Sequence, residues 1–271
     1  MSGAPAPYGL VATDLDGTLL RSDGTVSERT RAALDAVCAN GAAHIIVTGR
    51  AVPWTRPVLQ ELGYDGLAVC GQGAQVYDAG AGRMLTSVTL DRRLAQLALA
   101  RIEEEVGPLA LAASRDGEDG EVLIGPGYRM TGPLEMVPYE DPAEVWAAPL
   151  NKMYVQHPTL DDDTLAAAAR RAAGDLVGVT MSGEGIVELL PLGLNKARGL
   201  SLAARRLGIP PSATLAFGDM PNDIPMFAWS ARGIAMKNAH SELLSVADEV
   251  TASNDEDGIA LVLERLLEDR G

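Results

Sequence analysis

Residues 11–20 read VATDLDGTLL, an apolar run that ends in two aspartates two positions apart. The apolar residues before Asp14 predict a short buried strand over 9–13, and the glycines after Asp16 predict a loop over 17–24. Ligands of open parallel sheets bind beyond the carboxyl ends of the strands. Asp14 and Asp16 are therefore expected at the place in a sheet where chemistry is done.

Apolar strands of this kind recur along the chain and alternate with helices. Ser27 can cap a helix that stops at Gly41, because its hydroxyl can accept a bond from a free N–H of the first turn. Continuous apolar strands that alternate with helices indicate a parallel sheet covered on both faces. We expect strands over 9–13, 43–47, 66–70, 214–217, 234–236 and 249–251, and helices over 27–40, 53–62, 196–207, from 222 onward and over 257–268.

The pattern changes between residues 80 and 189. The helices expected there are 91–106 and 161–173, and the strands are 84–89, 109–114, 121–124, 151–156, 177–181 and 185–190, with a loop over 126–149. We therefore predict an α/β fold with two parts. A Rossmann-like parallel sheet core is formed by residues 1–79 and 190–271, and an α+β domain, residues 80–189, is inserted into it.

The composition limits the possible partners. The chain has 271 residues, of which 47 % are hydrophobic, and its formal net charge is −15. Nucleic acid and anionic membranes both need clustered cations, so neither is expected as a partner. The start, MSGAPAPYG, does not resemble a secretory signal. No apolar segment reaches the roughly 20 residues that span a bilayer. Only two cysteines occur. We therefore expect a cytoplasmic protein. Its oligomeric state does not follow from the sequence.

Six charged or hydroxyl side chains fall at the carboxyl ends of expected strands or at the start of a helix. They are Asp14, Asp16, Thr48, Lys196, Asp219 and Asp223. Four carboxylates in one crevice would raise one another's pKa unless a cation neutralised them. A hard dication with oxygen ligands is the natural partner. Mg²⁺ is expected, because it accepts few protein ligands and keeps water and phosphate oxygens around it.

These residue types in this arrangement predict phosphoryl transfer. Asp14 can attack a phosphoryl group and form an acyl phosphate, while Asp16 can protonate the leaving oxygen and then deprotonate water. Thr48 can donate a hydroxyl, and Lys196 a positive charge, to the phosphoryl oxygens. Gly17 allows the backbone to approach the phosphate closely.

At this point the sequence resembles the haloacid dehalogenase superfamily, and within it the Cof-type phosphatases. The matching segments, in chain order, are DLDGTL (14–19), TGR (48–50), Lys196, GDMPNDIPMF (218–227), IAMKNA (234–239), ADEVT (247–251) and NDEDGIA (254–260). The insert resembles the C2B cap of that family in its length and in its order of strands and helices.

The resemblance implies roles for the matched residues. Asp14 would be the nucleophile, and Asp16 would be the acid/base and a metal ligand through its carbonyl. The other implied roles are metal binding by Asp14, Asp219 and Asp223, and phosphate binding by Thr48, Gly49, Lys196 and Asn222.

Two positions depart from the family pattern. Many relatives have Asn-Gly-Ala after the third strand, where this chain has Gln72-Gly73-Ala74. Lys196 is followed by Ala197, where glycine is commoner. The first difference is expected to alter the contact between the core and the insert.

The predicted function is Mg²⁺-dependent hydrolysis of a small phosphorylated metabolite, with sugar phosphates as the leading class. Two alternatives remain open. One is a phosphomutase or phosphotransferase, which passes the phosphoryl group to a second hydroxyl. The other is a non-catalytic regulator that accepts phosphate at Asp14. Asp16 argues against the regulator, because a simple acceptor needs no adjacent acid/base.

Several other residues have simpler explanations. The aspartates over 161–163 are expected to cap a helix, and residues 254–257 to form a loop and a helix cap. Arg50 can either contact substrate or close the strand end. The three histidines are expected to be structural or on the surface, because they share no ligand spacing: they are His44, His157 and His240.

Overall fold

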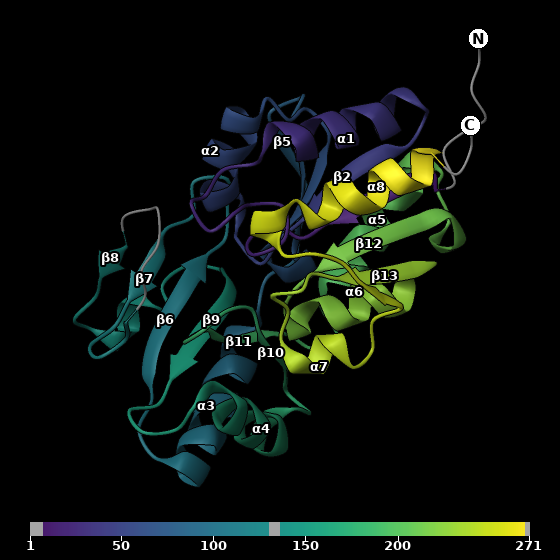
Figure 1. Cartoon of the computed structure of the whole chain (residues 1–271). Coiled ribbons are helices and arrows are strands. Elements are labelled where there is room, and N and C mark those ends of the chain that lie inside the picture. Colours follow the sequence, from purple (N-terminus) through teal and green to yellow (C-terminus); the bar gives the residue numbers. More distant parts are fainter. Residues whose placement is uncertain (1–7, 130–135, 269–271) are drawn as a thin grey trace.

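A computed structural model describes residues 8–129 and 136–268, which form two sheets with helices packed on them (Figure 1). The first sheet has the strand order β14-β13-β12-β1-β2-β3-β4-β5. Its strands are β1 (Leu10–Thr13), β2 (Ala43–Val47), β3 (Leu67–Cys70), β4 (Gln75–Asp78), β5 (Arg83–Ser87), β12 (Thr214–Gly218), β13 (Arg232–Ala235) and β14 (Glu249–Val250).

The centre of this sheet is parallel, and its register aligns the strand ends. Thr13 pairs with Ile46 of β2 on one side and with Phe217 of β12 on the other. The residues that follow β1, β2 and β12 therefore leave the sheet at the same edge. β4 and β5 extend the sheet in the antiparallel direction.

Helices cover both faces of the first sheet, as the continuous apolar strands predict. One face packs against α1 (Glu28–Ala39), α2 (Val52–Leu62) and α8 (Gly258–Glu268), and the other against α5 (Lys196–Leu207), α6 (Ile224–Trp229) and α7 (Ser241–Leu244). The Ser27 hydroxyl accepts a bond from the Thr30 N–H and caps α1, which confirms that prediction.

The second sheet has the order β10-β11-β9-β6-β7-β8. Its strands are β6 (Ala110–Arg115), β7 (Val122–Ile124), β8 (Val137–Pro138), β9 (Leu150–Gln156), β10 (Val177–Met181) and β11 (Val187–Pro191). α3 (Arg92–Val106) and α4 (Asp162–Ala173) pack together on one face of this sheet (Figure 1). Asp161 caps α4 as expected.

Some elements differ from the expectation. The strand expected over 84–89 was assigned to the insert, but β5 pairs with β4 and lies in the first sheet. β4 itself was not expected, and the loop expected over 126–149 contains the short strand β8. The predicted domain boundaries after 79 and 189 remain a prediction. The first seven residues, to which the interpretation of the start applies, and residues 130–135 of that loop lie outside the described residues.

Within the described residues, no helix combines the length and the apolar character that crossing a bilayer requires.

Candidate active site

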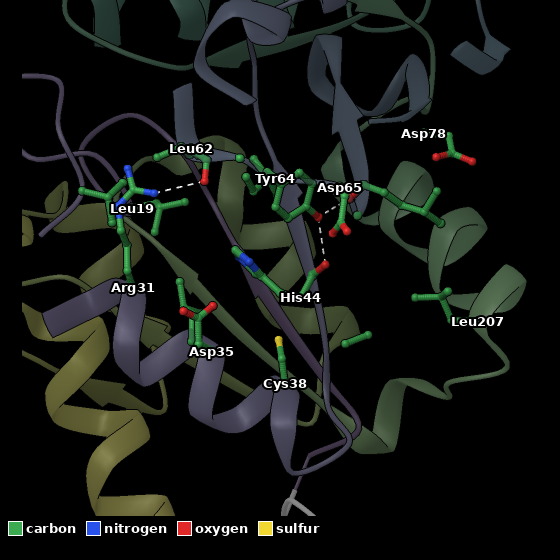
Figure 2. Close-up of a pocket in the computed structure, with 17 residues that line it drawn as sticks. Leu19, Arg31, Asp35, Cys38, His44, Leu62, Tyr64, Asp65, Asp78 and Leu207 are labelled. Carbon is green, nitrogen blue, oxygen red and sulfur yellow. Dashed lines mark hydrogen bonds between the residues drawn. The ribbon is translucent and has the colours of Figure 1, made fainter. Parts of the chain in front are cut away.

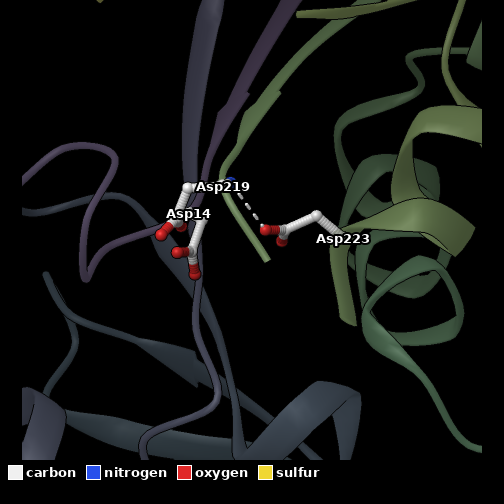
Figure 3. A group of neighbouring side chains, drawn as sticks. All are labelled: Asp14, Asp219 and Asp223. Atoms are coloured by element: carbon white, nitrogen blue, oxygen red, sulfur yellow. Dashed lines mark hydrogen bonds between the residues drawn. The ribbon is translucent and has the colours of Figure 1, made fainter. Parts of the chain in front are cut away.

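Three carboxylates meet at the edge where the central strands end. Asp14 directly follows β1, Asp219 directly follows β12, and Asp223 lies one short turn further on. Each offers an oxygen within 4.8 Å of the others, and all three residues are buried (Figure 3). The structure thus brings together three of the four aspartates that the sequence places in one crevice.

Lys196 provides the positive charge among these carboxylates. Its Nζ donates to Asp14 Oδ1 and to Asp223 Oδ1, each at 2.6 Å, and its side chain is 1 % exposed. Lys196 is the first residue of α5, and the Asn195 side chain caps that helix by accepting from the Arg198 N–H. The cap fixes the helix start and with it the stem of the lysine.

The shifted pKa values follow from this crowding. Burial, which the charges of Asp223 and Asp219 reinforce, raises the pKa of Asp14 above its usual range although Lys196 opposes the shift. Burial and then the charge of Asp223 raise the pKa of Asp219 to about 7. For Lys196, burial alone would lower the pKa, but the carboxylates of Asp14 and Asp223 outweigh burial and raise it.

The group of carboxylates fits a hard cation. Its donors are carboxylate oxygens, which such ions prefer, and one lysine faces three acidic groups. Asp219 is held in place by the Thr18 hydroxyl, which donates to its Oδ1 at 3.0 Å. Gly17 allows this loop to lie against Asp219, because a Cβ at Gly17 would lie 2.3 Å from Asp219 Oδ2.

Asp16 is placed differently from the three buried carboxylates. Its side chain is exposed and accepts two bonds from the Arg50 guanidinium, at 2.8 Å from Nε and 2.5 Å from Nη2. The carboxylate is therefore at the mouth of the crevice, outside the group of three. Its predicted role as acid/base and its predicted ligation through the carbonyl remain predictions.

The residues predicted to bind phosphate line the same strand ends. Thr48 directly follows β2, and its Oγ1 accepts the Arg50 N–H at 3.0 Å. Asn222 is buried and its Nδ2 donates to Gln72 Oε1 at 3.0 Å, whereas its Oδ1 has no hydrogen-bond partner within the described part of the chain. A buried oxygen without a hydrogen-bond partner is typical of a site that a bound group completes.

Two cavities are relevant to this arrangement. One of about 220 Å³ lies between the two sheets and is lined by Gln72, Lys196 and Asn222 from one side and by Thr180 of β10 from the other. A larger one, about 550 Å³, lies near the amino ends of β2 and β3, beside His44 and Tyr64 (Figure 2). The smaller cavity reaches Lys196, which bonds Asp14 and Asp223, whereas the larger one is lined by neither the lysine nor these carboxylates, so volume alone does not identify the site.

No pattern in the sequence indicates a role for two further charged residues beside the crevice, Lys152 and Glu188. Both belong to the second sheet, where single charged residues in apolar strands are typical of a solvent-facing side. Thr18, which binds Asp219, lies within the DLDGTL segment and could have been found there.

Comparison with known proteins shows the family of the chain. Residues 11–263 match the model of the haloacid dehalogenase-like hydrolases. The chain belongs to this family. The resemblance inferred from its motifs is confirmed, and so is the enzyme class that it implied, a phosphoric monoester hydrolase.

Curated relatives of this hydrolase have several names. An HMP-PP phosphatase of Serratia proteamaculans is 28 % identical and matches over 90 % of this chain and 89 % of its own. The 5-amino-6-(5-phospho-D-ribitylamino)uracil phosphatase YwtE of Bacillus subtilis is 28 % identical, over 95 % and 97 % of the two chains. An Arabidopsis thaliana protein named chloroplastic endoribonuclease YBEY is 26 % identical, and the match spans only 45 % of its length.

Solved structures share the fold of this hydrolase. A haloacid dehalogenase-like hydrolase from B. subtilis superposes with a TM-score of 0.80 at 24 % sequence identity, covering 95 % of this chain and 99 % of the other. The predicted α/β class with a parallel sheet core is confirmed.

Proposed function

We propose that this hydrolase is a Mg²⁺-dependent phosphatase that cleaves small phosphorylated metabolites through an aspartyl phosphate on Asp14. The observation that carries the proposal is the position of the Asp14 carboxylate. It is buried at the end of a central strand, bonded to Lys196 and grouped with two further carboxylates that would hold a cation. Asp14, Asp219 and Asp223 would contribute ligands, and the bound Mg²⁺ would polarise the phosphoryl oxygens.

The chain's own residues divide the chemical work. Lys196 keeps Asp14 oriented and favours its ionised form, and its positive charge offsets charge that develops on the phosphoryl group. An oxygen of Asp14 bonds to phosphorus as the bond from phosphorus to the leaving oxygen breaks. The Asp16 carboxyl gives its proton to that leaving oxygen. Asp16 then takes a proton from the water that hydrolyses the acyl phosphate.

Arg50 has a defined part in this scheme. In this structure its guanidinium donates to both carboxylate oxygens of Asp16. A carboxylate bound in this way can only accept hydrogen bonds. Asp16 must release at least one of these bonds before it can carry a proton to substrate.

The substrate class follows from the size and charge of the site. One cavity of about 220 Å³ lies beside Lys196 and Asn222, and another of about 470 Å³ is lined by Asp16, Gly17 and Arg50. Both are of the size of a small metabolite. A net charge of −15 disfavours large polyanions. The relatives' names denote small phosphorylated compounds of two different kinds, and sugar phosphates remain our leading class for this chain.

The experiment is an assay of the purified protein with a chromogenic aryl phosphate, with and without Mg²⁺. We expect turnover that needs Mg²⁺ and is lost in Asp14→Asn, while Asp175→Asn, at an exposed aspartate that pairs with Arg101, keeps it. A panel of metabolite phosphates then ranks substrates by kcat/KM. Turnover by Asp14→Asn equal to that of the wild type would refute the mechanism.

A further inference from the structure

A buried ion pair of the second sheet reaches the phosphate-binding residues of the first. Lys152 of β9 and Glu188 of β11 form a salt bridge, and both residues are 1 % exposed. They lie on the face of their sheet opposite α3 and α4, because the alternate residues Met153 and Leu189 belong to the core under those helices.

Each charge of this pair completes its bonding with the other half of the molecule. Lys152 Nζ donates to the carbonyl oxygen of Gly49 at 2.7 Å, and it lies 4.8 Å from the centre of the Tyr154 ring. Glu188 Oε2 accepts from Gln72 Nε2 at 2.5 Å. Burial of an ion pair is unfavourable unless its remaining donors and acceptors are satisfied. The buried ion pair therefore depends on its contacts to Gly49 and Gln72.

The contact to Gly49 fixes a peptide group next to Thr48. Lys152 holds the carbonyl of the Gly49–Arg50 peptide, and the N–H of the same peptide donates to Thr48 Oγ1 at 3.0 Å. With its oxygen occupied as an acceptor in this way, the Thr48 hydroxyl can direct its own proton to a phosphoryl oxygen. A side chain at position 49 has no room, since a Cβ there would lie 2.7 Å from Gln72 Nε2.

The contact to Gln72 continues to Asn222. Gln72 Oε1 accepts from Asn222 Nδ2 at 3.0 Å, and the Gln72 N–H donates to the Thr48 carbonyl at 3.2 Å. Gln72 has a φ of 59°, in the left-handed region that is unfavourable for a residue with a side chain. Its bonds to Glu188, Asn222 and Thr48 offset that strain.

We propose that Lys152 and Glu188 are positioning residues for phosphate binding. Through Gly49 and Gln72 they set the orientation of Thr48 and Asn222, so the phosphate site is complete only when the second sheet is seated on the first. The proposal rests on the proposed function, because it assumes that the group bound there is a phosphoryl group.

The test uses the double variant Lys152→Met/Glu188→Gln. Removal of one partner alone would leave a buried unpaired charge, which is strongly destabilising and can unfold the protein. The double variant removes both charges and keeps the side-chain lengths. We expect it to fold, as circular dichroism and thermal melting will show. We also expect KM for an aryl phosphate and Kd for inorganic phosphate with Mg²⁺ to rise about tenfold or more, since small misplacements of binding groups have large effects.

The matched control is Arg101→Met/Asp175→Asn, which removes an exposed ion pair of the same half of the molecule with side chains 41 % and 68 % exposed. It should leave both constants at their wild-type values. A folded Lys152→Met/Glu188→Gln protein with wild-type KM and phosphate Kd would overturn the proposal. A lower kcat alone would also overturn it, because a purely structural role only reduces the folded fraction. Wild-type protein that neither hydrolyses the ester nor binds phosphate would instead overturn the proposed function, and this inference with it.

Discussion

One lysine among three buried carboxylates is the defining feature at the scale of single residues. When all four groups are ionised, Lys196 balances only one negative charge of Asp14, Asp219 and Asp223. Buried charges without partners are costly, so the site favours either a bound proton or a bound cation. Protons and Mg²⁺ should therefore compete for it.

This competition gives a prediction for the pH dependence of Mg²⁺ binding. The pKa of Asp219 is raised to about 7, so its carboxyl is mostly protonated at pH 6 and mostly ionised at pH 8. Because the cation binds the ionised form, Kd for Mg²⁺ should become about tenfold tighter from pH 6 to pH 8. Calorimetric titration in the absence of substrate measures it. Asp219→Asn should lose most of the binding, and equal affinity at the two pH values would contradict the account.

The sequence revealed three site residues of the first sheet because each of the three directly follows a strand. Asp14, Thr48 and Asp219 were all placed correctly from that rule and from the register of parallel strands. The sequence did not reveal that Arg50 would bind the Asp16 side chain outside the group of three carboxylates. That pairing depends on the direction of the Arg50 side chain, which starts from the end of another strand.

At the scale of elements, the close packing of α5 against the turn after β3 links the fold to the site. Gly73, in that turn, has a φ of 97°, and a Cβ there would lie 2.2 Å from the Asn195 carbonyl oxygen. Asn195 caps α5 immediately before Lys196. Any side chain at position 73 must therefore displace the helix start that carries the lysine.

Gly73→Ala should accordingly affect both stability and catalysis. The left-handed backbone alone costs alanine about 1–2 kcal/mol, and the clash with α5 adds to it. The matched control is Gly208→Ala at the other end of the same helix, where φ is 71° and nothing lies within 4 Å of the added Cβ. Urea unfolding should show a loss for both variants that is larger for Gly73→Ala, and kcat/KM should fall only in Gly73→Ala. Equal losses with unchanged kcat/KM would refute this link.

Elements were predictable where one physical signal dominated. The strands around Asp14 and the helices after Ser27 and Asp161 follow from apolar runs and capping residues. β4 was missed because Gln75–Asp78 is short and follows the turn at Gly73. Lys152 and Glu188 alternate with apolar residues, a pattern typical of a strand with one face in water, but that face is covered by the first sheet and its loops.

At the scale of the whole molecule, the fold contains a second polar region away from the carboxylates. His44 lies in β2 beside the cavity of about 550 Å³ (Figure 2). Its Nε2 lies 2.8 Å from Thr13 Oγ1. Burial lowers the pKa of His44 to about 4. The expectation that this histidine is structural agrees with that environment.

His44 should make the folded protein sensitive to acid. Its pKa is lower when folded than the usual 6.5, so the unfolded chain binds more protons between about pH 6.5 and pH 4. Its contribution to stability is complete above pH 6.5 and is lost as the pH falls toward 4. From pH 7 to pH 5 the loss should be about 2 kcal/mol. Urea unfolding of His44→Gln should show a smaller decrease between these pH values than the wild type, and an identical decrease would show that His44 does not contribute.

The arrangement of the two sheets relative to each other could not be predicted from the sequence. It depends on pairs far apart in the chain, such as Arg56 with Asp119 and Gln72 with Glu188. The charged turn after β6 contributes Asp119 and also Glu118, which accepts the Met84 N–H at 2.6 Å. No local propensity encodes such contacts, because they join residues that are far apart in the chain.

The most direct measurement of the central claim is chemical trapping of the phosphorylated enzyme. Asp16→Asn removes the group that activates water, so the acyl phosphate should accumulate after substrate is added with Mg²⁺. Acid quenching, proteolysis and mass spectrometry should then find one phosphoryl group on the peptide that contains Asp14, and none when Asp14→Asn is added to the variant. A phosphoryl group on a different residue, or rapid hydrolysis by the protein that lacks the Asp14 carboxylate, would contradict the account.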